Sequence, residues 1–307
     1  GGMLIIEGNK LEWGRGPTST SAAAIAIYNR GYNGSVLPNC IVRNNSMILS
    51  QDGVRTAYAC MIASVGTTAH WDIIDINNNV FMGGGVNINH STATSYVARR
   101  VVCNSNYVKG STQAAFAIRF VRDSISFNDN TAFDNFSQGA YLSGADASNM
   151  CAVISATGNT LLDNVRAYLT ASAIDCEILG RYATRAIVQG NTVGSFNELL
   201  FLSGGAAASF TVGDVVTGGT SGATATVTYI QGTQRLMIER TRSGTFTNGE
   251  TITGSISGFS TTLTSVAFTS NQFMISFTDI TTLWQGNNVG LNKTVVGVLN
   301  VGTNNTI

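Results

Sequence analysis

Charged residues and proline are both scarce in this sequence. Lys, Arg, Asp and Glu make up 11% of the 307 residues, the formal net charge is zero, and only two prolines are present. A chain without a basic excess offers no electrostatic surface for nucleic acid or for an acidic membrane, so neither is expected as a partner. Asn, Ser and Thr fill the polar positions instead, which favours neutral, hydroxyl-rich ligands or contact with further copies of the chain.

Signals for export, membrane insertion and metal binding are also missing. No apolar run approaches the ~18 residues of a membrane span, and no signal peptide opens the chain. The five cysteines are scattered and mostly flanked by apolar residues, which is typical of buried thiols in a reducing cytosol. The two histidines, His70 and His90, lack the spacing of metal ligands. G-x-S-x-G, Walker A and dinucleotide motifs are absent, so no cofactor or metal is expected.

What the sequence does contain is a pattern repeated around asparagine. An Asn follows a short segment of alternating apolar and polar residues at intervals between 24 and 36 residues, as from 106 to 130 and from 9 to 45. The alternation predicts strands with one buried face. The Asn is expected in a turn, where it tolerates the left-handed backbone region. The repeated positions are Asn9, Asn45, Asn79, Asn106, Asn130, Asn159 and Asn191.

Units of this size cannot bury a face alone, but stacked units share one continuous core. We therefore expect an all-β fold, a right-handed parallel β-helix. A β-propeller is the alternative, but it needs about four strands in each repeat of ~40–50 residues. The repeats here are shorter and irregular, which favours the β-helix.

One interval is much longer than the others. The pentapeptide QGNTV at 189–193 returns as QGNNV at 285–289, 96 residues later. Between them FTVGDVVTGGTSG (210–222) is followed, 36 residues on, by FTNGETITGSISG (246–258), with seven of thirteen positions identical. We therefore predict a β-helix over 1–205, an inserted small β domain over 206–267, and the helix continuing over 268–307. No cap is recognisable before the first strand, which favours a piece of a larger or oligomeric protein.

The irregular repeats resemble a known family. Segments such as ISFNDNTAFDN (125–135) and CAVISATGNTLLDN (151–164) are similar to the pectate-lyase-like right-handed β-helices of tailed-phage tailspike and tail-fibre proteins. The paired Gly/Thr repeats of the insertion look like those of phage virion proteins. The resemblance implies a homotrimer that is made in the host cytoplasm and joins other tail proteins in the virion. It also implies binding, and often cleavage, of bacterial surface polysaccharide (capsule or lipopolysaccharide), at acids that occupy no fixed motif.

Two groups of acids are candidates for glycoside hydrolysis, which uses paired carboxyl groups ~5–5.5 Å or ~6.5–9.5 Å apart. In SAIDCEIL, Asp175 and Glu177 alternate with apolar residues, so both are expected to face outward, about 6.5–7 Å apart. The alternative is an ordinary solvated strand face. Asp72, Arg99 and Asp123 are expected to stack on consecutive rungs, with the two acids about 10 Å apart. That arrangement suits either an inverting pair with Arg99 on the substrate or a structural salt-bridge ladder.

Aromatic residues supply candidate sugar platforms. His70 and Trp71 adjoin Asp72, although Trp71 alternatively packs in the core. An aromatic stripe follows the Asn column by about ten residues, and its members either face outward to stack on sugar rings or point into the core. The stripe comprises Tyr58, Phe116, Tyr141, Tyr168 and Phe201, of which Tyr141 and Tyr168 are the substrate-binding candidates.

Three functions remain open on the sequence alone. The first is a polysaccharide depolymerase, a glycosidase in preference to a lyase. The second is a non-cleaving glycan-binding shaft of a tail fibre, and the third is a secreted bacterial polysaccharide lyase or hydrolase.

Overall fold

The computed structural model describes most of the chain. The described residues are 3–12, 24–29, 36–48, 58–65, 70–90, 95–135, 137–162, 164, 177–195, 198–231, 233–238, 243–266, 275–277, 281–291 and 299–301. Nearly all of them lie in β-strands or in turns, and the described residues include one short 3-10 helix, η1 (Ser203–Ser209). In the described part of the chain no helix is long and apolar enough to cross a membrane.

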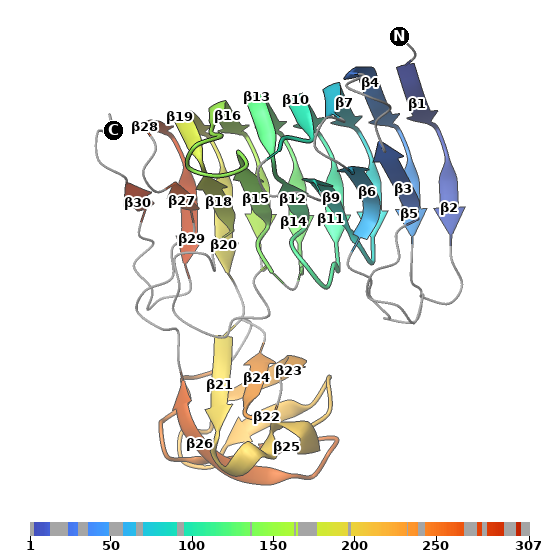
Figure 1. Ribbon diagram of the computed structural model, residues 1–307. Coiled ribbons are helices and arrows are strands. Elements are labelled where there is room, and N and C mark those ends of the chain that lie inside the picture. The colour runs from blue at the N-terminus through green and yellow to red at the C-terminus, as the bar shows by residue number, and fades with distance from the viewer. Residues whose placement is uncertain are drawn as a thin grey trace.

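Three parallel sheets of eight strands each dominate the structure (Figure 1). Sheet A contains β1 (Met3–Glu7), β4 (Val36–Arg43), β7 (His70–Asn77), β10 (Ala98–Asn104), β13 (Val121–Asn128), β16 (Cys151–Thr157), β19 (Ala183–Gln189) and β28 (Thr281–Gln285). Sheet B contains β2 (Lys10–Glu12), β5 (Ser46–Ile48), β8 (Val80–Met82), β11 (Tyr107–Lys109), β14 (Thr131–Phe133), β17 (Thr160–Leu162), β20 (Thr192–Ser195) and β29 (Asn288–Leu291). Sheet C contains β3 (Ile25–Asn29), β6 (Tyr58–Ser64), β9 (Gly85–His90), β12 (Phe116–Ile118), β15 (Ala140–Ser143), β18 (Ile178–Arg181), β27 (Ile275–Phe277) and β30 (Leu299–Val301).

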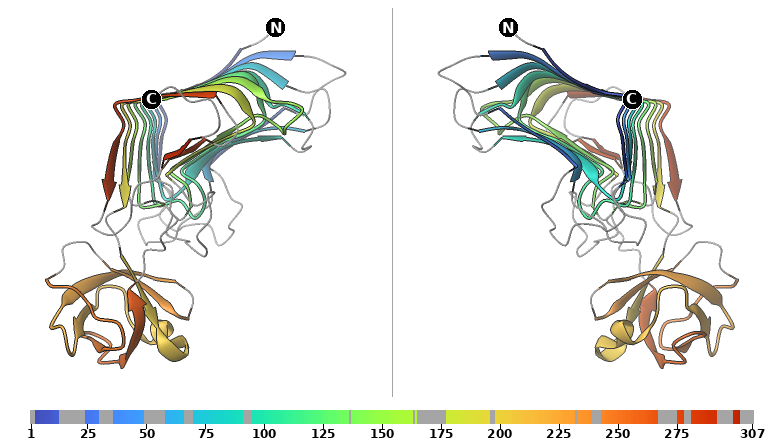
Figure 2. Two further views of the ribbon diagram at one scale, coloured as in Figure 1. Left: turned by 90° about the vertical axis from the view of Figure 1, so that its left-hand side faces the viewer. Right: turned by 90° about the vertical axis from the view of Figure 1, so that its right-hand side faces the viewer.

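The chain visits the sheets in the order A, B, C, and each such circuit is one rung of a stack. Successive rungs lie over one another when the stack is viewed end on (Figure 2). The all-β architecture with stacked parallel sheets is consistent with a β-helix or solenoid. A propeller blade, by contrast, is built from the four strands of one repeat. Here the strands inside each parallel sheet pair with their equivalents in the rungs before and after, as β10 does with β7 and β13.

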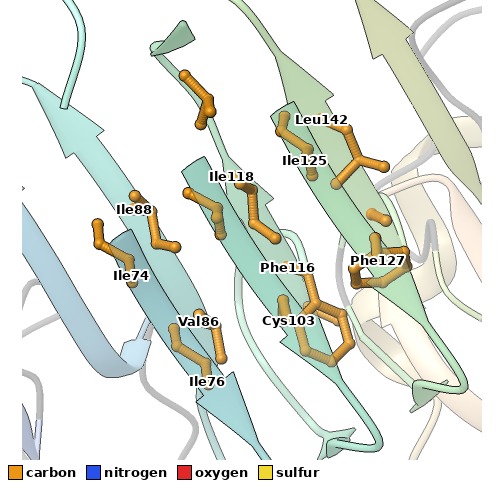
Figure 3. Packing of buried hydrophobic residues seen from close by; sticks show 14 of the residues in the cluster. Ile74, Ile76, Val86, Ile88, Cys103, Phe116, Ile118, Ile125, Phe127 and Leu142 are labelled. Atoms are coloured by element: carbon orange, nitrogen blue, oxygen red, sulfur yellow. The ribbon is translucent and has the colours of Figure 1, made fainter. Parts of the chain in front are cut away.

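The predicted apolar columns are in register, which confirms that equivalent residues sit over one another. Val101 pairs with Ile74 on one side and Ile125 on the other, and Cys103 pairs with Ile76 and Phe127. These residues point into one continuous core between the sheets (Figure 3). Each large aliphatic or aromatic side chain buried in this way contributes about 1.5–3 kcal/mol.

Cysteines form part of this core, as the sequence predicts. Cys40, Cys60, Cys103 and Cys151 are free and buried. Burial raises the pKa of Cys40 to about 12 and that of Cys151 to about 12. These thiols therefore stay protonated and unreactive at neutral pH. Cys176 lies outside the described residues.

A ladder of asparagines, buried except at its two ends, runs along the corner between sheets A and B. In each step the backbone N–H and the side-chain amide of one Asn donate to Oδ1 of the next, at 2.8–3.1 Å. The same amide group also donates to a backbone carbonyl of the preceding rung at 2.8–3.0 Å. The ladder comprises Asn9, Asn45, Asn79, Asn106, Asn130, Asn159, Asn191 and Asn287.

The left-handed backbone conformation lies one residue before each ladder Asn, so its expected place at the Asn itself is wrong. The preceding residues all have φ between 55° and 70°. They are Gly8, Asn44, Asn78, Ser105, Asp129, Gly158, Gly190 and Gly286. This explains why QGNTV and QGNNV recur: Gly190 and Gly286 make the turn, and Asn191 donates to Asn287 Oδ1 at 3.1 and 2.8 Å.

Between β20 and β27 the chain forms a closed antiparallel barrel with its own hydrophobic core. Its strands are β21 (Glu198–Leu202), β22 (Val215–Gly218), β23 (Thr224–Gln231), β24 (Arg235–Ile238), β25 (Thr251–Gly254) and β26 (Ser260–Val266). Strand β21 pairs with β24 and β26. The barrel therefore begins before residue 206, the predicted start of the insertion. The apolar residues of β21 alone do not distinguish it from one more strand of the stack.

The two sequence repeats of the barrel hold each other in place through buried acids. Asp214 of the first repeat accepts hydrogen bonds from the backbone N–H groups of Ile256 and Ser257 in the second, at 2.6 and 2.9 Å. Glu250 of the second repeat accepts from Thr220 and Ser221 in the first, at 3.1 and 2.9 Å. Each carboxylate thus caps the turn of the opposite repeat.

Candidate functional site

Four of the nine predicted site residues meet at one corner of the stack, where the chain passes from sheet C into sheet A. Six polar side chains from three consecutive rungs form a connected group there, which we call the corner cluster. Its members are His70, Asp72, Tyr96, Arg99, Arg122 and Asp123. They lie at or just before the first residues of β7, β10 and β13.

Arg99 links the two predicted carboxylates. Its Nη1 lies 3.1 Å from Asp72 Oδ1, and its Nε lies 3.0 Å from Asp123 Oδ2. The register explains the contact, because Ala98 pairs with Trp71 and so brings the next residue beside Asp72. Arg99 is 41% exposed, Asp72 29% and Asp123 34%, so solvent and ligands can reach all three. The predicted stacking of the three residues on consecutive rungs is confirmed.

Two residues that the sequence did not single out complete the cluster. Arg122 Nε lies 2.8 Å from Asp123 Oδ1, and Arg122 Nη1 lies 3.2 Å from Tyr96 Oη. The guanidinium also lies 5.0 Å from the centre of the Tyr96 ring. Tyr96 Oη in turn meets His70 Nε2 at 3.2 Å, with the two ring centroids 4.5 Å apart. In the sequence, the only sign of these two residues is that Arg122 stands next to Asp123.

The electrostatics of the cluster favour binding over proton donation. The hydrogen bond from Arg122 is the largest influence on Asp123 and, with Arg99, it outweighs partial burial and lowers the pKa of the carboxyl group. A general acid of a glycosidase needs a raised pKa. Asp123 is therefore a stable anion at neutral pH and is poorly suited to donate a proton to a glycosidic oxygen.

A raised carboxyl pKa occurs nearby, at Asp75. Burial raises the pKa of Asp75, and the charge of Arg43 and the hydrogen bond from Asn77 offset this only in part. Asp75 lies on the outer face of sheet A, where its neighbours in register are Ile41 and Val102. The sequence carried one signal for it, an acid between Ile74 and Ile76 in a column where the two neighbouring rungs have the apolar residues Ile41 and Val102.

Glu177 does not face outward, so the predicted orientation is wrong. It is 1% exposed and ends a second polar ladder inside the stack. Its Oε1 accepts from the Asn164 backbone N–H at 3.0 Å, and its Oε2 accepts from Asn164 Nδ2 at 2.6 Å. Asn135 donates to Asn164 Oδ1 in the same way, at 3.2 and 2.6 Å. Glu177 thus takes the place that an Asn amide oxygen holds in other rungs, because its two oxygens accept the same pair of donors.

Glycine leaves the space for this buried carboxylate. A Cβ at Gly139 would lie 2.9 Å from Glu177 Oε2 and 3.0 Å from Asn164 Nδ2. The proposed partner of Glu177 in catalysis, Asp175, lies outside the described residues. The buried position of Glu177 leaves it a structural role, and its predicted catalytic role has no support from its surroundings.

Trp71 packs in the core and does not form a sugar platform. It is 3% exposed and belongs to the main hydrophobic cluster. Its indole N–H is buried and has no acceptor among the described residues. Of the two alternatives for Trp71, packing is therefore the one observed.

The aromatic stripe divides between the two faces of sheet C. Phe116 is fully buried and pairs in register with Ala140, whereas Tyr141 pairs with Ala117 and is partly exposed. A shift of one residue puts the two aromatic rings on opposite faces. Phe201 belongs to the barrel strand β21, and Tyr168 lies outside the described residues. Tyr141 remains a candidate for ligand contact, with the Arg119 guanidinium 5.7 Å from its ring centre.

Comparisons with known proteins add no family to this geometry. No family model, no curated protein and no solved structure matches the chain. Among the described residues no group of three or more His, Cys, Asp or Glu could hold a metal ion.

Proposed function

We propose that this chain belongs to a tailed-phage tailspike or tail fibre and that the flank of its stack binds a bacterial surface polysaccharide, capsule or lipopolysaccharide. The observation that carries the proposal is the corner cluster. It presents partly exposed carboxylate, guanidinium and phenol groups on three consecutive rungs, so its polar groups repeat along the stack. A long polymer of hydroxyl-rich units suits such a linear array better than a compact small molecule does.

Within this function, recognition is better supported than hydrolysis. Asp72 and Asp123 are both bound by Arg99, and the pKa of Asp123 is lowered. Glu177 is buried in the stack. A non-cleaving receptor-binding shaft is therefore our first proposal, and a depolymerase that uses Asp72 or Asp123 is the second.

The finer features of the fold belong to the same proposal. We take the coil to be right-handed, because parallel crossover connections in one sheet are right-handed in about 98% of cases. We take the barrel as a domain inserted into one rung, between β20 and β27. The partners would be further virion tail proteins and two other copies of the chain.

Partly exposed apolar residues on the outer face of sheet A support self-association. They include Ile41, Ile73, Val102, Val153 and Ile187. Light scattering of the purified protein should give three times the chain mass of 32.2 kDa. A mass of one chain at micromolar concentration would contradict the trimer.

Incubation with a panel of capsular polysaccharides and lipopolysaccharides tests the function. Binding would be measured by interferometry, and the chain length of the polysaccharide by size-exclusion chromatography. We expect binding without shortening. Shortening that is lost in Asp72→Asn or Asp123→Asn would favour the depolymerase, and the absence of binding to any bacterial glycan would overturn the proposed function.

A further inference from the structure

Two arginine–aromatic pairs lie beside the corner cluster, and none of their residues belongs to it. Arg119 and Phe120 connect β12 to β13. Two rungs later, Arg181 is the last residue of β18 and Tyr182 connects it to β19. The Arg119 guanidinium carbon lies 5.8 Å from the Phe120 ring centre, and that of Arg181 lies 5.0 Å from the Tyr182 ring centre. The same arrangement thus occurs twice along the stack.

Both aromatic residues have a strained backbone. Phe120 has φ 63° and Tyr182 has φ 51°. Bulky residues avoid this left-handed region, and such strain persists mainly where the surroundings impose it, often at binding sites. The left-handed positions before the ladder asparagines hold only Gly, Asn, Ser or Asp, which are small, whereas Phe and Tyr are bulky.

Among the described residues, neither arginine of these pairs has an acidic partner, in contrast to Arg99 and Arg122. Arg119 Nε is buried and has no acceptor in the described part of the chain. Asp146 lies between β15 and β16, on the rung between the two arginines. Its carboxylate accepts from the Ser148 and Asn149 backbone N–H groups at 2.7 and 2.8 Å and from Asn149 Nδ2 at 3.1 Å, so its hydrogen bonds lie within its own turn.

The arginines stand in one line along the stack. Ser143 pairs in register with Arg181, and the pairing of Ile118 with Leu142 puts Arg119 beside Ser143 on the other side. Two rungs separate the backbone positions of the two arginines, which is about 10 Å at the ordinary strand spacing. Tyr141, whose ring lies under Arg119, is on the rung between them.

We infer that this line of Arg119, Tyr141 and Arg181 is a subsite for an acidic polysaccharide, in which uronate carboxylates pair with the two arginines and a sugar ring stacks on the tyrosine. The inference rests on the proposed glycan-binding function and specifies the chemical class of the glycan. Guanidinium groups bind carboxylates in a two-pronged geometry, and aromatic faces suit the apolar face of a sugar ring. An anion at each arginine would supply the charge partner that the described residues do not.

Matched polymers and matched variants test the subsite. The probes are polygalacturonate, alginate and hyaluronan, each compared with its methyl-esterified form, which keeps the backbone and removes the charge. The variants are Arg119→Gln and Arg181→Gln, with Arg185→Gln on β19 as the control, because Arg185 is exposed and lies on sheet A. Circular dichroism verifies that each variant is folded.

We expect at least one acidic polymer to bind, to bind more weakly at higher salt, and to lose affinity on esterification. A charge-assisted hydrogen bond contributes about 1.5–3 kcal/mol, so each corner variant should weaken binding by about 10- to 100-fold. The Arg185→Gln control should stay within about twofold of the wild type, less than half of one kcal/mol.

Equal binding of the esterified polymers, or corner variants no weaker than the control, would overturn the subsite. Binding of only neutral bacterial polysaccharides would also overturn it, while leaving the proposed function intact. Binding of no polysaccharide of either kind would overturn both.

Discussion

The residue that most determines this structure is the ladder asparagine. Its side chain carries both a donor and an acceptor, so one residue type can accept from the rung before and donate to the rung after. Asn106 shows the full set: its amide donates to Asn130 Oδ1 at 3.0 Å and to the Ile76 carbonyl at 2.8 Å, while its Oδ1 accepts from Asn79. Neither Asp nor Leu can reproduce this set.

Replacing Asn106 by Ala should destabilise the protein strongly. The change takes away the acceptor of the Asn79 backbone N–H and the side-chain donor to the Ile76 carbonyl, at ~1–3 kcal/mol each. It also removes one of the acceptors of the Asn79 amide, which keeps its bond to the Val42 carbonyl at 2.9 Å. We expect a loss of about 3–5 kcal/mol in the free energy of unfolding, measured by urea denaturation. The control is Asn104→Ala, which lies two residues away in a partly exposed outer column and accepts from the Asn128 N–H. Water can replace that bond, so a loss below about 1 kcal/mol is expected, and equal losses in the two variants would contradict the ladder.

Glu177 should behave as a structural residue. In Glu177→Gln one carboxylate oxygen becomes an amide nitrogen that faces an N–H donor of Asn164, which should cost about 1–3 kcal/mol. Exposed Glu12→Gln is the control and should change stability by less than ~0.5 kcal/mol. Urea denaturation measures the free energy of unfolding of both variants. Unchanged stability of Glu177→Gln, together with loss of a glycan-cleaving activity, would restore the catalytic interpretation.

At the scale of elements, sequence reasoning succeeded where a pattern is enforced by contact between rungs. The Asn spacing and the apolar columns were predictable because each position must match its neighbours above and below. The aromatic stripe was not, because Tyr141 and Phe116 differ by one residue in register and alternation alone cannot show this. The orientation of Glu177 was predicted wrongly for a related reason. Alternation with apolar residues predicts an exposed acid, and the sequence does not show that Asn164 supplies hydrogen bonds to a buried one.

The corner cluster could be predicted only in part. Asp72, Arg99 and Asp123 lie at equivalent distances before the ladder asparagines, so their stacking follows from the repeat. Tyr96 joins them through the connection before β10, whose path no periodicity describes. The repeat therefore locates residues within strands and leaves the connections undetermined.

The barrel should lose stability in acid. Burial alone would raise the pKa of Asp214 and of Glu250, but the backbone donors from Thr211, Ser257 and Ile256, and from Thr247, Ser221 and Thr220, outweigh it and lower both values. A carboxyl group with a lowered folded-state pKa stabilises fully above its unfolded-state value, here 3.8 and 4.5, and loses this contribution as pH falls toward the folded-state value.

Thermal unfolding followed by circular dichroism between pH 7 and pH 2 measures this effect. Asp214→Asn and Glu250→Gln should be less stable than the wild type at pH 7, and their stability should depend less on pH below about 4.5. The glycines beside the acids set the geometry, because a Cβ at Gly218 would lie 2.5 Å from Glu250 Oε2. An unchanged acid profile in both variants would contradict the capping role.

At the scale of the whole molecule, the stack turns local repeats into a long regular flank. Equivalent positions recur at each rung spacing of about 4.8 Å, so a polymer lying along the axis meets side chains at a regular spacing. The corner between sheets C and A combines the corner cluster with the two arginine–aromatic pairs. This accumulation of charge and aromatic surface is notable in a chain with only 11% charged residues.

The most direct measurement is a crystal structure of the protein with an oligosaccharide derived from an acidic polysaccharide that it binds. We predict sugar density along the corner between sheets C and A, with carboxylates at Arg119 and Arg181 and a ring over Tyr141. An oligosaccharide bound on the barrel, or on sheet B, would contradict the account.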